Sequence, residues 1–112
     1  MMKGRSVLTK KIESEIELLE RHVTMLNTII EHEPIGIIRL SELLSIPQHK
    51  VRYSLRILEQ EGLINPSPEG AVTTERVDAF FDELNDILMQ MDSTVNRLRI
   101  GLEAKKRDGT NN

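Results

Sequence analysis

The chain has 112 residues, of which 38% are hydrophobic and 29% are charged, and its formal net charge is −3 at pH 7. This length suffices for one modest hydrophobic core and excludes a separate catalytic domain with its own cleft. Cysteine is absent, which excludes disulfides, thiolate zinc sites and thiol nucleophiles. One tyrosine and two phenylalanines are the only aromatic residues, so an aliphatic, helical core is favoured over a β-sandwich.

The start of the chain and its charge distribution limit where the protein works. Residues 1–9 include Lys3 and Arg5 but lack the apolar run of a secretory signal, and no stretch of the sequence is apolar enough to cross a bilayer. We therefore expect a cytoplasmic protein without a membrane partner. The negative total argues against a sequence-independent coat on DNA, because non-specific affinity depends on neutralising many phosphates. Basic residues nevertheless cluster in the middle of the chain, at Lys50, Arg52 and Arg56.

The first predicted element is a long helix over residues 6–32. Its apolar residues recur at steps of three and four, which is the spacing of a heptad stripe; they are Leu8, Ile12, Ile16, Leu19, Val23, Leu26 and Ile30. Ser6 or Thr9 can cap its start, and Pro34 with Gly36 marks its end. Residues 35–38 are then predicted to form a short β segment.

Residues 35–74 are predicted to contain two more helices and a hairpin. Apolar residues at 40, 43 and 44 indicate a short helix, which Ser45-Ile46-Pro47 interrupts. Val51, Leu55 and Leu58 indicate a helix over 48–61, and Gly62 ends it. Segments 63–65 and 71–73 flank the turn-rich residues 66–70, which predicts a small hairpin.

The last predicted helix covers residues 75–106 and can be capped by Thr73 or Thr74. Its apolar residues alternate steps of four and three from Val77 to Leu102, a length of roughly 40 Å. Because a small domain cannot cover so long a stripe, we expect it to form a coiled-coil dimer. The predicted dimer contacts are Phe81, Leu84, Leu88, Met91, Val95 and Leu98. Packing of the first and last helices within one chain is the open alternative. Residues 107–112 are expected to be a disordered tail.

The segment from Leu40 to Val51 resembles the helix-turn-helix of bacterial and archaeal winged-helix regulators. Residues 59–64, Glu-Gln-Glu-Gly-Leu-Ile, resemble the passage from their recognition helix into the wing. The outer helices resemble those of small archaeal regulators and chromatin proteins that dimerise through a coiled coil, with the MarR and PadR groups as more distant relatives. Two features depart from the pattern: Ser45 stands where many such motifs have glycine, and the wing tip carries Glu69 without a lysine or arginine.

The resemblance implies a mainly α fold with a small β-wing, a single winged helix-turn-helix domain flanked by long N- and C-terminal helices. It also implies which apolar residues hold the two central helices together, namely Leu40, Leu44, Ile46, Val51, Leu55 and Leu58. The implied function is that of a homodimeric, sequence-specific regulator of transcription that places helix 48–61 in the major groove of double-stranded DNA. The alternative is a winged-helix module that binds other proteins and not DNA.

The candidate DNA contacts lie on the outer face of helix 48–61. At about 100° per residue, this face is opposite the apolar stripe, and the predicted contacts are Gln48, His49, Lys50, Arg52, Tyr53 and Arg56. Arginine can bind guanine O6 and N7 or a phosphate, and glutamine can pair with adenine. Ordinary solvated side chains are the simpler interpretation of the same pattern.

Other chemistries find little support in the sequence. His22, His32 and His49 lie apart and no cysteine accompanies them, so we expect no metal site. Because a glycine-rich phosphate loop, a nucleophile elbow and a catalytic triad are all missing from the sequence, we expect neither an enzyme nor a cofactor. Methionines 25, 89 and 91 could line a pocket for an apolar effector, but methionine at helical spacing usually fills a core.

Overall fold

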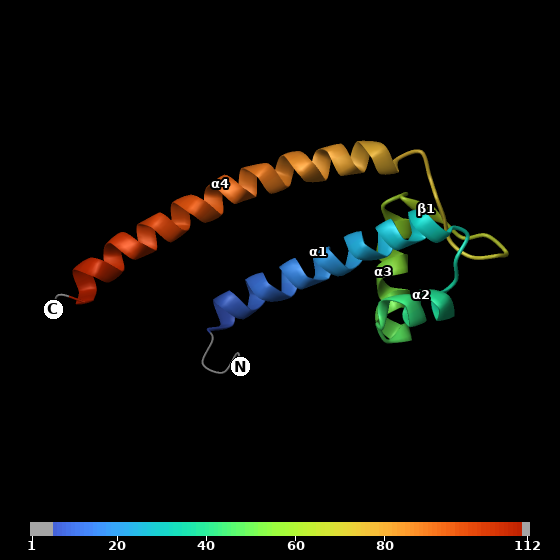
Figure 1. The fold of residues 1–112 in the computed structure, drawn as a ribbon, viewed down its shortest axis with the longest axis horizontal. Coiled ribbons are helices and arrows are strands. Elements are labelled where there is room, and N and C mark those ends of the chain that lie inside the picture. Colours follow the sequence, from blue (N-terminus) through green and yellow to red (C-terminus); the bar gives the residue numbers. More distant parts are fainter. Residues whose placement is uncertain (1–5, 111–112) are drawn as a thin grey trace. The chain divides into compact units, whose positions relative to one another are not determined.

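The computed structural model describes residues 6–110. They fall into two compact units, the first ending at Arg76 and the second beginning at Val77. Helices dominate, and one two-stranded sheet accompanies them, which confirms the predicted mainly α class with a small β hairpin. In chain order the elements are α1 (Val7–His32), α2 (Ile37–Leu44), α3 (Gln48–Gln60), β1 (Ile64–Asn65), β2 (Val72–Thr73) and α4 (Val77–Thr110) (Figure 1).

Helix α1 is fixed at both ends by side-chain hydrogen bonds. Ser6 is the N-cap, and its Oγ accepts the backbone N–H of Thr9 at 3.2 Å. At the other end Glu33 adopts an extended conformation, and its carboxylate accepts the Thr73 backbone N–H at 2.7 Å. The Thr73 hydroxyl donates to the same carboxylate at 2.9 Å. The end of α1 is therefore tied to β2.

The core of the first unit lies where the C-terminal half of α1 packs against α3 (Figure 1). Its largest apolar side chains without solvent exposure are Met25, Leu26, Ile29, Leu40 and Val51. Each contributes about 1.5–3 kcal/mol by leaving water. Met25 therefore fills the core, whereas Met89 is 63% exposed and Met91 48% exposed on α4.

Helix α2 begins earlier than the sequence suggested. The β segment expected over 35–38 is reduced to Ile35, which pairs with Ala71 through two backbone hydrogen bonds of 3.2 and 2.8 Å. Ile37 and Ile38 are instead the first residues of α2. The reason is helical spacing: Ile37, Leu40 and Leu44 fall on one side of a helix, where Leu40 is buried and the other two are half-buried.

The turn between α2 and α3 passes through Ser45, which has φ 54° and ψ 43°, the left-handed conformation. The Ser41 hydroxyl closes this turn by donating to the Ile46 carbonyl at 2.6 Å. Pro47 then precedes the first residue of α3. Serine therefore occupies a left-handed position, a conformation in which glycine is more common.

The predicted hairpin is present, with strands slightly shorter than expected. β1 and β2 pair antiparallel, Ile64 with Thr73 and Asn65 with Val72. Gly70 in the turn has φ 132°, and a Cβ there would lie 2.4 Å from the Ile35 carbonyl carbon. Only glycine permits this approach between the turn and the Ile35 backbone.

Helix α4 starts two residues later and ends four residues later than the expected bounds of 75 and 106. Thr74 does not cap it: its hydroxyl donates to the Gly62 carbonyl at 2.6 Å and accepts the Arg76 N–H at 3.2 Å. The backbone stays helical to Thr110 because Ala, Lys and Arg at 104–107 favour helix, so the tail expected from 107 is helical as far as 110. Residues 111 and 112 lie outside the described part. Within residues 6–110, no helix is long and apolar enough to cross a membrane.

Candidate functional site

A shallow hollow of about 490 Å³ lies where α1 and α3 meet. Its lining consists of Arg21 from α1 together with His49, Lys50, Arg52, Tyr53 and Arg56 from α3. We call it the basic hollow. It gathers five of the six residues predicted as DNA contacts, and the sixth, Gln48, is exposed at the first position of α3 but does not line it.

The basic hollow follows from the amphipathic pattern of α3. Val51, Ser54 and Leu58 face the core and are buried. The opposite face of α3 points outward, and the five residues from α3 that line the hollow are all exposed, Tyr53 to 38%. α3 thus presents one apolar face to the protein and one cationic face to solvent.

Two residues that anchor the hollow, Arg21 and Ser54, were missing from the sequence prediction. The Ser54 side chain is fully buried, and its Oγ accepts the Arg21 Nε–H at 3.1 Å. The same oxygen lies 2.9 Å from His22 Nδ1. A signal for Ser54 existed, because it falls on the buried stripe between Val51 and Leu58 at steps of three and four, where a polar residue needs a partner. No pattern in α1 pointed to Arg21, which joins α3 only through the tertiary packing.

The aromatic ring of Tyr53 lies beside both Arg21 and His22. The guanidinium carbon of Arg21 is 6.0 Å from the centre of the ring, at the outer limit of a cation–π contact. The His22 ring is also 6.0 Å away, tilted by 38°. Arg21 is therefore held by a hydrogen bond on one side and an aromatic ring on another.

Burial lowers the pKa of His22 below its ordinary value, and the positive charge of Arg21 lowers it further. The neutral imidazole is therefore favoured. In the neutral form Nδ1 can accept the Ser54 hydroxyl hydrogen while the hydroxyl oxygen accepts from Arg21. The buried Ser54 hydroxyl therefore has both an acceptor and a donor as partners.

The positive charge of the hollow is not neutralised by the protein. Arg21, Lys50, Arg52 and Arg56 line it, and among the described side chains none of them has a carboxylate partner. This concentration is notable in a chain whose net charge is −3. An uncompensated group of guanidinium and ammonium side chains is suited to binding a polyanion.

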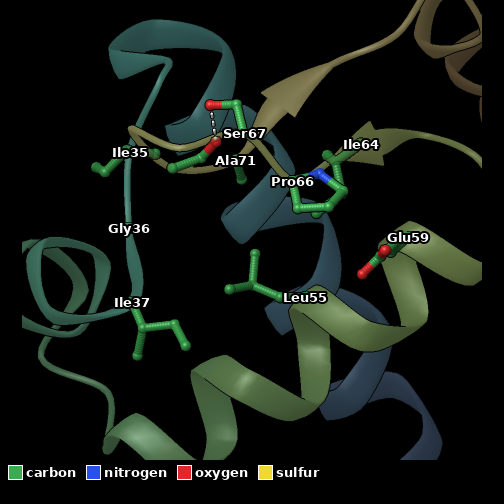
Figure 2. Close-up of a pocket in the computed structure, with 10 residues that line it drawn as sticks. Ile35, Gly36, Ile37, Leu55, Glu59, Ile64, Pro66, Ser67 and Ala71 are labelled. Atoms are coloured by element: carbon green, nitrogen blue, oxygen red, sulfur yellow. Dashed lines mark hydrogen bonds between the residues drawn. The ribbon is translucent and has the colours of Figure 1, made fainter.

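Two further hollows flank the hairpin. One, of about 260 Å³, is mainly apolar and lies between α3, the Ile35–Ile37 segment and the hairpin; Figure 2 shows Leu55, Ile64 and Pro66 around it, with Glu59 at its edge. The other, of about 320 Å³, brings the hairpin-tip residue Glu69 together with His32 and Arg39. Among residues 6–110, no group of three or more His, Cys, Asp or Glu side chains could hold a metal ion.

The predicted dimer contacts lie on α4, apart from the basic hollow in sequence. Phe81 and Leu84 are partly exposed, and the exposed fraction then rises from 42% at Leu88 to 61% at Leu98. Met91 and Val95 lie between these values. The N-terminal half of α1 carries a second exposed stripe, with Leu8 at 71% and Ile12 at 58%.

No family model and no curated protein matches the chain. Among solved structures, its fold resembles that of the activation domain of the phage T4 transcription factor MotA. The TM-score is 0.52 and the identity 20%, over 66% of this chain and 79% of that chain. At this identity the likeness concerns the fold.

Proposed function

We propose that the chain is a homodimeric, sequence-specific DNA-binding regulator of transcription, and that α3 is the recognition helix of a winged helix-turn-helix domain. The observation that carries the proposal is the basic hollow, in which three cationic side chains of α3 and one of α1 lie together without carboxylate partners. The order α2, turn, α3 and hairpin is that of a helix-turn-helix followed by a wing. Similarity in fold to a transcription factor domain is consistent with this role.

The dimensions of α3 fit the major groove. Its 13 residues span about 20 Å, and a groove about 12 Å wide admits one helix. Arg52 and Arg56 are four residues apart on one face, so both can reach neighbouring base pairs or phosphates. Gln48 and His49 at the start of α3 can contact base edges, because recognition helices use their N-terminal residues in this way.

A dimer explains the exposed apolar stripe of α4. Four α4 residues with exposed fractions of 42–61% continue a heptad repeat, and an α4 without a partner helix would leave this stripe in water. In a homodimer the two α3 helices can bind successive half-sites, about 34 Å apart on one face of the duplex.

Arginine-to-alanine variants test the proposal after an operator has been selected from random duplexes. At least one of Arg52→Ala and Arg56→Ala should weaken operator binding by roughly 1–3 kcal/mol and relax specificity at one position. Arg99→Ala removes the same charge from exposed α4, off the heptad stripe, and serves as the matched control. If both α3 variants keep native affinity and sequence preference, α3 is not the recognition helix.

A protein-binding module is the second candidate, because the apolar hollow beside the hairpin provides a specific observation in its favour (Figure 2). Its lining includes Ile37, Leu55 and Ile64, which could accept an apolar side chain of a partner. The acidic hairpin tip at Glu69 would suit a protein more than a phosphate backbone. This candidate predicts no measurable duplex binding, whereas the first requires it.

A further inference from the structure

We propose that Arg21 of α1 is a phosphate-binding residue that grips the backbone of duplex DNA beside the groove occupied by α3, and that Ser54 positions it. The inference rests on the proposed function and adds a contact from a second helix, outside the recognition motif. The residues that carry it are Arg21, Ser54, His22 and Tyr53, which form one contact group at the edge of the basic hollow.

The hydrogen bond from Arg21 leaves its binding edge free. Nε donates to Ser54 at 3.1 Å, and neither terminal nitrogen has a partner among the described side chains. A guanidinium is planar and carries five N–H donors, so fixing Nε still leaves the edge between the two terminal nitrogens for a bidentate contact. That edge matches two oxygens of one phosphodiester.

Ser54 holds the Arg21 side chain in one position. Its side chain is completely buried in the contact between α1 and α3, so its oxygen is a fixed acceptor. The Tyr53 ring restricts the guanidinium from another side, with its centre 6.0 Å from the guanidinium carbon. An arginine held in this way loses less side-chain entropy on binding than a solvated one.

Phosphate is a better ligand for Arg21 than a base. The residue belongs to α1 and not to the helix proposed to enter the groove, and side chains beside a recognition helix face the strands that border the groove. The hairpin also lacks a cation, because Pro66, Ser67, Pro68, Glu69 and Gly70 form its turn. The backbone contact that a basic wing normally supplies must therefore come from elsewhere, and Arg21 shares its hollow with Lys50, Arg52 and Arg56.

Salt-dependent binding of Arg21→Gln and Arg21→Lys to the selected operator and to a random duplex tests the inference. For each subunit on the DNA, Arg21→Gln should weaken binding to both duplexes about tenfold near 0.1 M salt and reduce the slope of log K against log salt by about 0.9, the value for one phosphate contact. For a homodimer with both subunits bound, the slope should therefore fall by about 1.8. The ratio between operator and random affinity should not change. Arg21→Lys keeps the charge and should retain most of the salt slope. Ser54→Ala should weaken binding to both duplexes about threefold and largely keep the slope, because the charge of Arg21 remains but is less well positioned.

Lys11→Ala is the matched control, because it removes one exposed charge from the same helix about 15 Å along its axis. It should leave affinity and slope close to those of the native chain. Tyr53 is the single tyrosine, so 3-fluorotyrosine labelling gives one fluorine NMR signal that reports both folding of each variant and occupancy of the hollow.

The outcomes separate this inference from the proposed function. Native duplex binding by a folded Arg21→Gln variant, with an unchanged slope, overturns the inference and leaves the proposed function intact. An equal loss in Lys11→Ala also overturns it, because the effect would then be one of total charge. A native chain that binds no duplex overturns both. Should Arg21→Gln fail to fold by its fluorine signal, Ser54→Ala decides the test, and native affinity of that folded variant for both duplexes would contradict the inference.

Discussion

Ser45 shows how one residue can depart from a motif and keep its conformation. It adopts the left-handed conformation, φ 54°, that ends α2, and no described hydrogen bond involves its hydroxyl. Holding an L-residue in this conformation costs the folded state roughly 1–2 kcal/mol. Glycine avoids this cost, but it also loses more conformational freedom on folding, which offsets part of the gain. We expect Ser45→Gly to raise the free energy of unfolding by about 0.5–1 kcal/mol. Urea denaturation of Ser45→Gly and Ser45→Ala measures this, and an alanine variant more stable than the glycine variant would contradict the explanation.

His22 makes stability depend on pH in a defined direction. Its pKa is lowered in the folded chain by burial and by Arg21, so at pH values between the lowered pKa and 6.5 the unfolded chain binds more protons. The contribution of His22 is therefore present above pH 6.5 and is lost as the pH falls through the folded-state value. His22→Gln should lose less stability than the native chain on acidification through this range.

Denaturant titrations at several pH values measure that difference. His49→Gln is the matched control, because its imidazole is exposed in the basic hollow and makes no described hydrogen bond. If the free energy of unfolding depends on pH equally in the native chain and in His22→Gln, His22 has the same pKa in the folded and unfolded states, which contradicts the account.

At the scale of elements, the hairpin tip offers a test of how close the wing approaches DNA. Glu69 lines one hollow together with Arg39, and the turn residues at the tip include no cation. Glu69→Lys should tighten binding to all duplexes equally and steepen the salt dependence by up to about one unit for each bound subunit. Glu69→Gln removes the negative charge without adding a cation, so it should change the affinity and the salt slope less than Glu69→Lys does. Unchanged affinity and slope in Glu69→Lys would place the tip away from the DNA, and a changed sequence preference would make the wing a reader of bases.

Long periodic elements were predictable from the sequence because burial imposes a spacing on them. α1 and α3 agree with their expected ranges to within one residue, since Ser6, Pro34 and Gly62 mark boundaries that the backbone follows. The segment 35–38 was ambiguous, because a short run of isoleucines suits either a strand or the first turn of a helix. Its tertiary position decided the matter, with Ile35 pairing to Ala71 and Ile37 beginning α2.

The candidate site was predictable in part for the same reason. The outward residues of α3 follow from the stripe of Val51, Leu55 and Leu58, so one helix was enough to find them. Arg21 required knowledge of which turn of α1 crosses α3, and that depends on packing among distant residues. Contacts between elements are therefore the part of the site that periodicity did not reveal.

For the whole molecule, the exposed stripe of α4 predicts a dimer that two substitutions should break. Leu88 and Met91 lie at core positions of the heptad and are 42% and 48% exposed. Glutamate at both positions would bury two charges in a coiled-coil seam, so Leu88→Glu with Met91→Glu should give monomers. Light scattering after size-exclusion chromatography measures the mass.

Met89→Glu is the control for that experiment, because Met89 is 63% exposed and lies off the stripe. It should remain dimeric. A double variant that still forms dimers would place the interface elsewhere, with the exposed α1 residues Leu8, Ile12 and Ile16 as the next surface to change.

Equilibrium binding of the native chain to duplex DNA at moderate salt tests the central claim most directly. The account predicts that a duplex selected from a random pool binds at least about 10³-fold more tightly than an unrelated duplex, and that both affinities fall as salt rises. Non-specific binding should lie near 10⁻⁴–10⁻⁶ M at physiological salt. If selection enriches no sequence and every duplex binds only in the millimolar range, the basic hollow of α3 does not serve DNA recognition, and the protein-binding alternative takes its place.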